Sequence, residues 1–239
     1  MRILPAMEKL VYVVWRESGL SPEAFRETVC GPVAQQLGDA GARRIAASLA
    51  DEHVQDKLGQ RLTRLEPPPD GIVSFWLDNA DDRGPCEAAL EAATDTLAGY
   101  LVVESVPLLN TTRKAALGER TPGVNMVALL ERPERLAWAA WIAIWHERHK
   151  IVALETQCTY AYVRNVVVRS LTPDAPPWAG IVEEGFPAEA IGNPAVWYDA
   201  EDDPTKLARN IERMVESCKA FLDLDRVESH PTSEYRLSD

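Results

Sequence analysis

The strongest constraint on the fold of this 239-residue chain is an order of predicted strands and helices that occurs twice. The first copy opens with a predicted strand at residues 9–15, whose β-branched and aromatic side chains are typical of a buried strand. A helix is predicted at residues 22–38, because Ser21 is a typical N-cap and Pro22 is a typical first helical residue. The same patterns predict the other elements of this copy, which are strands at 43–50, 72–77 and 100–106 and a helix at 84–98.

The second copy follows residues 108–123, a stretch without sustained periodicity that we interpret as a linker. Its elements come in the same order, with predicted strands at 124–130, 156–171, 178–186 and 221–228 and predicted helices at 133–154 and 204–218. The sequence therefore predicts two repeats of β-α-β-β-α-β order, one at residues 1–107 and the other at residues 124–239.

This element order is that of a ferredoxin-like unit, an antiparallel sheet with helices on one face. The other face of such a sheet is bare and has to be covered. Two copies in one chain can cover both bare faces by packing their sheets together. We therefore expect an α+β fold in which tandem ferredoxin-like repeats pack sheet to sheet as an intramolecular α+β barrel, with an interior that side chains or a ligand can fill.

Charge and composition exclude several classes of partner. The net charge of −12 repels phosphate polymers and anionic lipid surfaces, so no nucleic-acid partner is expected. No apolar run reaches the roughly 18 residues of a membrane span, so no membrane partner is expected either. The four cysteines, Cys30, Cys86, Cys158 and Cys218, form no C-x-x-C pair, which predicts reduced thiols and a cytoplasmic protein.

Three segments resemble a known family. Residues 9–16 (KLVYVVWR) and 19–26 (GLSPEAFR) are similar to the opening strand, turn and helix start of the EthD family, and residues 145–153 (WHERHKIVA) resemble its helix with a histidine near the end. The resemblance covers nearly the whole chain and implies a fused two-copy form. It also implies the fold of the dimeric α+β barrel superfamily, which includes cofactor-free polyketide cyclases and dehydratases, small monooxygenases and haem enzymes.

The two copies differ in their histidines. Where the helix of the family often reads His-Gly-Pro, the first copy has residues 30–32 (CGP), and its only histidine, His53, lies beyond the second predicted strand. The second copy carries His146 and His149, which are three residues apart and so share one face of an α-helix. The resemblance therefore implies that the second copy is the active half, with His149 and His146 as its catalytic residues.

Proton transfer is the chemistry that these histidines suit, because imidazole titrates near neutral pH. His149 lies nearer the end of the predicted helix, where the terminal carbonyl groups favour the cation and are expected to raise its pKa. The spacing His-Glu-x-His differs from the zinc motif H-E-x-x-H, so no metal and no cofactor are expected. The alternative is that one histidine is exposed to solvent and the other hydrogen-bonds the backbone at a helix end.

The predicted strand at 156–171 carries candidate ligand-binding residues. Tyr160, Tyr162 and Arg164 share one face because strand side chains alternate, and we expect this face to point into the barrel. Two phenol groups and a cation there would suit a phenolate, enolate or carboxylate. Trp178, which follows two prolines, is a further candidate at the mouth of a cavity. The alternatives are a plain core for the tyrosines and a surface-loop anchor for Trp178.

These residues favour a protein that binds an aromatic or polyketide-like small molecule, or a cofactor-independent lyase, cyclase or isomerase that uses histidine for proton transfer. One alternative is an oxygenase of the same superfamily, either cofactor-free or haem-dependent. Another is a non-catalytic EthD-like partner of an oxidising system. The expected partner is a small hydrophobic or aromatic molecule, and a homodimer is also compatible with the resemblance.

Overall fold

The computed structural model describes residues 7–239, so the first six residues of the predicted first repeat lie outside the described residues. The first half contains the strands and α-helices β1 (Glu8–Trp15), α1 (Pro22–Thr28), α2 (Ala34–Asp39), β2 (Arg43–Leu49), β3 (Gly71–Leu77), α3 (Gly84–Glu91) and β4 (Thr96–Leu108). It also contains the π turn η1 (Val29–Val33) and the 3-10 segments η2 (Glu52–Gln60) and η3 (Ala80–Asp82).

The second half has a longer helical layer. Its strands and α-helices are β5 (Val124–Leu130), α4 (Trp138–Ala143), α5 (Lys150–Thr156), β6 (Ala161–Ser170), β7 (Gly180–Phe186), α6 (Pro194–Trp197), α7 (Pro204–Phe221) and β8 (Glu228–Arg236). A π turn, η4 (Ile144–His149), connects α4 to α5, and the 3-10 turns are η5 (Ala188–Ala190) and η6 (Leu224–Arg226). Within the described residues, no helix has both the length and the apolar character that a membrane span requires.

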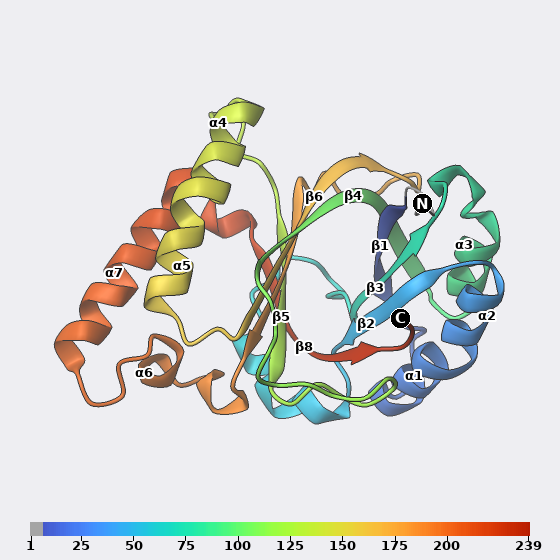
Figure 1. The fold of residues 1–239 in the computed structure, drawn as a ribbon, viewed down its shortest axis with the longest axis horizontal. Helices are drawn as coiled ribbons and strands as arrows, with labels where there is room; N and C mark the ends of the chain where they lie inside the picture. Colours follow the sequence, from blue (N-terminus) through green and yellow to red (C-terminus); the bar gives the residue numbers. More distant parts are fainter. Residues whose placement is uncertain (1–6) are drawn as a thin grey trace, which may run out of the picture.

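The strands of residues 7–239 form one closed antiparallel barrel in the order β1-β3-β2-β8-β5-β7-β6-β4 (Figure 1). Each half contributes four neighbouring strands in equivalent order, β4-β1-β3-β2 from the first and β8-β5-β7-β6 from the second. The halves meet edge to edge through the antiparallel pairs β2–β8 and β4–β6. The predicted fold class, tandem ferredoxin-like units in an intramolecular α+β barrel, is confirmed. The exact repeat boundaries at residues 107 and 124 stay a prediction.

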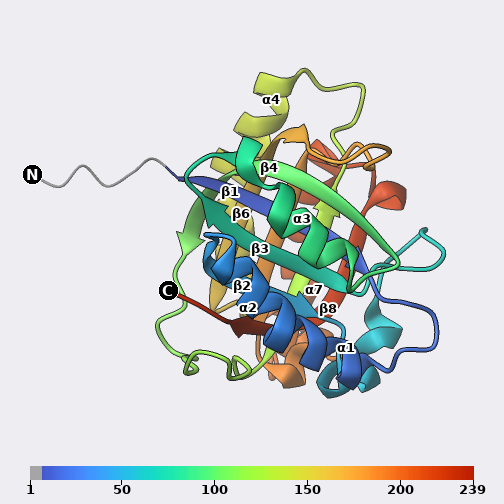
Figure 2. The same cartoon turned by 90° about the vertical axis from the view of Figure 1, so that its right-hand side faces the viewer.

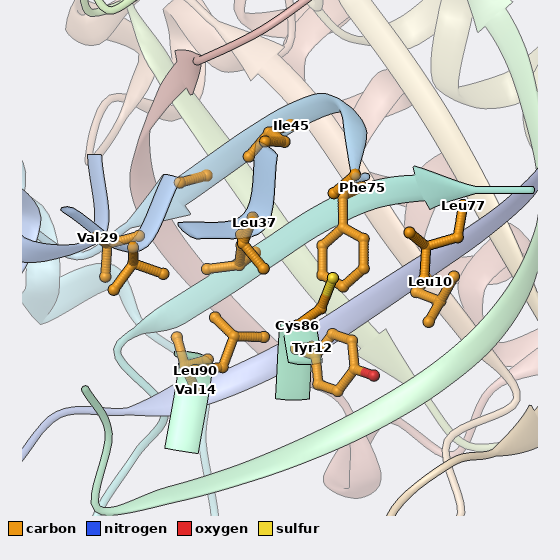
Figure 3. Close-up of a cluster of buried hydrophobic side chains, with 14 of the residues drawn as sticks. Leu10, Tyr12, Val14, Val29, Leu37, Ile45, Phe75, Leu77, Cys86 and Leu90 are labelled. Carbon is orange, nitrogen blue, oxygen red and sulfur yellow. The ribbon is translucent and has the colours of Figure 1, made fainter. Parts of the chain in front are cut away.

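Helices cover the barrel from two opposite sides. In Figure 1, α1, α2 and α3 lie to the right of the barrel and α4, α5 and α7 lie to its left. Figure 2 shows the first set lying across β1, β2 and β3. The buried cluster beneath these helices includes Tyr12 and Phe75, whose rings stack with centroids 5.5 Å apart (Figure 3). A second apolar cluster fills part of the barrel interior, and a third lies beneath α4 and α7.

Two of the three long helical segments in the described chain, at residues 22–39 and 138–156, run through a π turn. The predicted helix at residues 22–38 contains a proline at its centre, and the structure places Pro32 inside the π turn η1 between α1 and α2. The tryptophan-rich helix starts at Trp138 and continues through the π turn η4 to Thr156. Such wide turns are rare and occur often at functional sites, so the position of His146 and His149 within η4 is notable.

The last predicted strand is wrong. Residues 221–228 were expected to form it, but α7 continues to Phe221 and the strand is Glu228–Arg236. The apolar side chain of Phe221 packs the end of α7 into the core, where it is 1% exposed, and does not begin a strand. The true strand is rich in polar residues that are nevertheless buried, including His230 and Thr232, so its sequence lacks the apolar alternation of a typical strand.

Candidate active site between the second sheet and its helices

A cavity of about 360 Å³ lies between the outer face of the second sheet and the helical segments η4 and α7. We call it the helix–sheet cavity. Its walls are mostly apolar, with side chains from β5, β6 and β7 on one side and from η4 and α7 on the other. A mainly apolar cavity with a few polar groups is typical of a small-molecule site. Its lining residues include Trp145, His149, Tyr162, Glu184 and Phe221.

Aromatic side chains build the deep wall of the cavity. Trp145 is fully buried and stacks on Phe221 with ring centroids 6.4 Å apart. Its Nε1 donates a hydrogen bond of 3.1 Å to the hydroxyl oxygen of Tyr162. The indole fits because residue 180 is glycine, where a Cβ atom would lie 2.6 Å from the Trp145 ring. The wall is therefore fixed by packing and by a buried hydrogen bond.

His149 lines the cavity at the end of the π turn. Its Nδ1 lies 2.9 Å from the Ser217 hydroxyl on α7, and its ring packs against Phe221 with centroids 4.6 Å apart. Burial, with a smaller contribution from the Arg164 cation, lowers its pKa to about 4. The predicted increase in the pKa of His149 is therefore wrong. Because α5 continues the helix to Thr156, His149 is not at a helix end, and burial dominates its pKa.

His146 does not line this cavity, although its spacing predicted a face shared with His149. Its ring meets Trp145 edge-on with centroids 4.8 Å apart, and its buried Nε2 has no hydrogen-bond partner within residues 7–239. Burial, followed by the nearby cations of Arg164 and Lys150, lowers its pKa to about 4. The wider winding of the π turn separates the two imidazoles, so the structure brings only His149 to the cavity.

The predicted orientation of the β6 strand is also wrong. Tyr162 and Arg164 point toward the helical layer, where Tyr162 joins the cluster of Trp145 and Phe221. Arg164 is 7% exposed and donates to the Ser105 hydroxyl at 3.2 Å and to the His146 carbonyl at 3.4 Å. On this strand the large Tyr162 packs beneath the helices, and Val167 packs against the apolar cluster inside the barrel.

The two remaining candidates lie elsewhere. Tyr160 precedes β6, where its hydroxyl donates to the Pro122 carbonyl at 3.1 Å and Arg113 lies over its ring. Trp178 is 3% exposed and joins the apolar cluster inside the barrel, beside Tyr100. Neither residue lines the helix–sheet cavity. Of the six candidate site residues, the structure therefore places His149 and Tyr162 together in this cavity.

Glu184 was missed by sequence reasoning and is the only carboxylate that lines the cavity in the described chain. It lies directly opposite Tyr162 on the neighbouring strand, and burial raises its pKa to about 7. No hydrogen bond to its carboxylate is found within residues 7–239. The alternation of side chains along a strand could have indicated its burial, because Glu184 falls on the same face as the buried Val182 and Phe186. A carboxylate on an apolar strand face is a functional candidate.

Metal ligands are not assembled in this cavity. In the described part of the chain, the one group of side chains with metal-like spacing is Asp51, Glu52 and His53 in the first half. The Asp51 carboxylate already accepts hydrogen bonds from the hydroxyl groups of Ser233 and Tyr235 at 2.8 and 2.6 Å. Its oxygens are engaged in holding β8 against the first half.

Comparisons with known proteins show the fold. No family model and no curated protein matches the sequence. An anthrone oxidase-like protein of known structure is similar over 99% of this chain and 95% of its own, with a TM-score of 0.53 and 7% identity. A proposed monooxygenase from Fusobacterium nucleatum subsp. nucleatum is similar over 97% of this chain and 94% of its own, with a TM-score of 0.54 and 6% identity. The chain therefore has the fold of the dimeric α+β barrel proteins.

Proposed function

We propose that this protein is an oxygenase of a flat aromatic or polyketide-like small molecule, bound in the helix–sheet cavity. The observation that carries the proposal is an aromatic-walled cavity in which a neutral histidine and a carboxyl group of raised pKa face the same space. The names of the two structural neighbours support oxidative chemistry over the non-oxidative reactions that the sequence favoured first. The similarity of residues 145–153 to the EthD family supports the second half as the active one.

His149 is the proposed base. At neutral pH its imidazole is uncharged, because its pKa is lowered to about 4. When Nδ1 carries the proton and donates it to Ser217, Nε2 is the nitrogen left to accept a proton from the substrate. A base must be neutral to act, so the lowered pKa keeps His149 competent over a wide pH range.

The reaction balances without an added reductant. His149 removes one proton from an acidic CH₂ group, and the resulting carbanion forms a C–O bond with O₂. The peroxide takes up a proton to become a hydroperoxide. Loss of the second C–H proton then forms the carbonyl as hydroxide leaves, and protonated Glu184 supplies the proton that turns this hydroxide into water. The sum is CH₂ plus O₂ giving C=O plus H₂O, so the substrate itself provides the electrons.

A haem does not fit the residues of this cavity. Within residues 7–239, no lysine or arginine lines the cavity to pair with the two propionate groups, and the carboxylate of Glu184 would repel them. The cofactor-free form of the oxygenase is therefore the one proposed. A small-molecule partner follows from this proposal. A cytoplasmic location and a homodimer are further proposals, the latter supported by the exposed Val103 and Val168 on the β4–β6 seam.

A non-oxidative isomerase or cyclase is the second candidate, because His149 and Glu184 alone suffice to move protons. Measuring O₂ consumption and deuterium exchange with anthrone in D₂O distinguishes the two functions. Under air, the oxygenase should consume one O₂ per anthraquinone formed, in the presence of a chelator. Under argon, either enzyme should exchange the CH₂ protons of anthrone for deuterium. Exchange without O₂ consumption above the uncatalysed rate would favour the isomerase, and the absence of both would contradict the proposed site.

A further inference from the structure

A second cavity, of about 330 Å³, lies at the end of the barrel where β1 and β2 finish and β3 begins. We call it the barrel-end cavity. Trp15, Leu58, Pro67 and Pro68 supply its apolar walls, and Arg61 supplies a guanidinium group. The indole of Trp15 is fixed by donating to the Pro67 carbonyl at 3.1 Å. The barrel-end cavity shares no lining residue with the helix–sheet cavity.

Arg61 is the unpaired cation of the barrel-end cavity. Its guanidinium makes no hydrogen bond and no ion pair within residues 7–239, and its buried Nε has no partner there. The neighbouring Arg16 is already satisfied, because its Nε lies 3.2 Å from the Asp70 carboxylate and it donates to the Leu20 carbonyl at 3.0 Å. Leaving this buried Nε without an acceptor is costly, and an anionic partner in the cavity would supply one.

Further buried polar atoms without a hydrogen-bond partner belong to His230 and Glu228 on β8. His230, on β8, is 2% exposed and neither of its ring nitrogens has a hydrogen-bond partner in the described chain. Its Nε2 lies 3.3 Å from a Glu228 carboxylate oxygen, which also lacks a hydrogen-bond partner. Burial and the field of Arg61 lower the pKa of His230 to about 3, which places the guanidinium within electrostatic reach of the imidazole. Buried orphan groups of this kind mark a place where a ligand or ordered water completes the network.

We propose that the barrel-end cavity binds a small monocarboxylate with an apolar body. The carboxylate oxygens would accept two hydrogen bonds from the planar fork of Arg61, which matches carboxylate geometry. The body would lie against Trp15 and the Pro67–Pro68 wall. A single negative charge fits best, because one guanidinium is unpaired and three acidic residues, Glu17, Asp70 and Asp95, also line the cavity. A phosphate dianion would meet greater repulsion from these carboxylates.

Benzoate is the probe of choice, and calorimetry measures its affinity. The wild-type protein should bind benzoate with a dissociation constant of about 1 mM or lower. Benzamide, the neutral analogue of similar shape, should bind at least 10-fold more weakly. The Arg61→Gln variant should lose about 10- to 100-fold in benzoate affinity, as expected for a charge-assisted hydrogen bond. The matched control is Arg169→Gln, which removes an arginine paired with Asp81 at the surface and should bind benzoate like the wild type.

Ring resonances of the histidines locate the bound probe. Benzoate should shift the His230 signals in the wild type and leave them unchanged in Arg61→Gln, while His149 reports on the helix–sheet cavity. An Arg61→Lys variant keeps the charge and should retain intermediate affinity, which guards against misfolding of the Gln variant. No benzoate binding, equal binding of benzamide, tighter binding of inorganic phosphate, or a shift confined to His149 would overturn the proposal. None of these outcomes depends on whether the protein oxidises anthrone.

Discussion

At the scale of single residues, the predicted chemistry depends on the protonation of His149 and Glu184. The pKa of His149 is lowered to about 4 and that of Glu184 is raised to about 7, so between these values the first is a free base and the second is a protonated acid. Environments that separate the pKa values of two neighbouring groups commonly assign acid and base roles. We expect the pH dependence of kcat/KM for anthrone, measured from pH 3.5 to 8.5, to be bell-shaped with apparent pKa values near these two.

Replacing His149 by glutamine should lower turnover by about 10²- to 10⁴-fold, because the proposed base is lost. His53→Gln is the control, since that imidazole is 48% exposed in the other half and should change stability by no more than about 0.5 kcal/mol. Rates of anthraquinone formation, together with thermal melting of both variants, provide the measurement. Near-full turnover in a folded His149→Gln variant would show that the histidine is structural.

The Glu184→Gln variant should become more stable relative to the wild type as the pH rises. The folded-state pKa of about 7 lies above the ordinary value of 4.5, so the folded protein retains a proton that the unfolded chain releases between these values. Wild-type stability therefore falls through this window relative to the variant, by up to about 3 kcal/mol at pH 7 and above. Urea unfolding at pH 5 and pH 8 measures the difference. Glu155→Gln, at an exposed carboxylate paired with Arg213, should show no such trend.

At the scale of elements, the contact between β7 and the tryptophan-rich helix fixes the wall of the helix–sheet cavity. A Cβ atom at Gly180 would lie 2.6 Å from the rigid indole of Trp145. Gly180→Ala should therefore destabilise the protein by about 1–3 kcal/mol and displace the aromatic wall. Gly38→Ala is the control, because no atom lies within 4 Å of its added Cβ and alanine favours the helix. An unchanged unfolding free energy for Gly180→Ala would contradict this packing.

At the scale of the whole molecule, a buried lysine connects the two halves through the barrel interior. Lys9 on β1 is 5% exposed, and its Nζ lies 2.6 Å from Glu104 on β4 and 3.6 Å from Glu183 on β7 in the other half. Asn165 donates a further hydrogen bond of 3.0 Å to Glu183. Because both carboxylates are largely withdrawn from water, they depend on this one cation for compensation.

Lys9→Met should destabilise the protein by roughly 2–4 kcal/mol, since it leaves two glutamates without their cation. Lys206→Met, which breaks an exposed pair with Asp199, should cost no more than about 1 kcal/mol. Urea unfolding at neutral pH measures both variants. Equal costs for Lys9→Met and Lys206→Met would show that the buried pair contributes no more than a surface one.

The sequence by itself determined the order of elements and the architecture that follows from it. Local signals were sufficient for this, since the Ser21 and Pro22 helix start and the apolar strand at residues 9–15 depend on near neighbours in the chain. Two ferredoxin-like units each leave one sheet face bare, and closing these faces together gives the barrel. Sequence reasoning also placed His149 on a helical segment of the second half, where the structure has it, although its catalytic role stays a prediction.

Only the tertiary structure decided which face of β6 meets the helices, where the last strand lies, and in which direction the pKa of His149 moves. Each of these depends on contacts between residues far apart in the chain. Ser217 meets His149 across 68 positions, and the polar β8 is a strand because it pairs with β2 and β5. Burial depends on the packing of all such elements at once, and this explains why neither the chemistry of Glu184 nor the barrel-end cavity around Arg61 could be predicted from local sequence patterns.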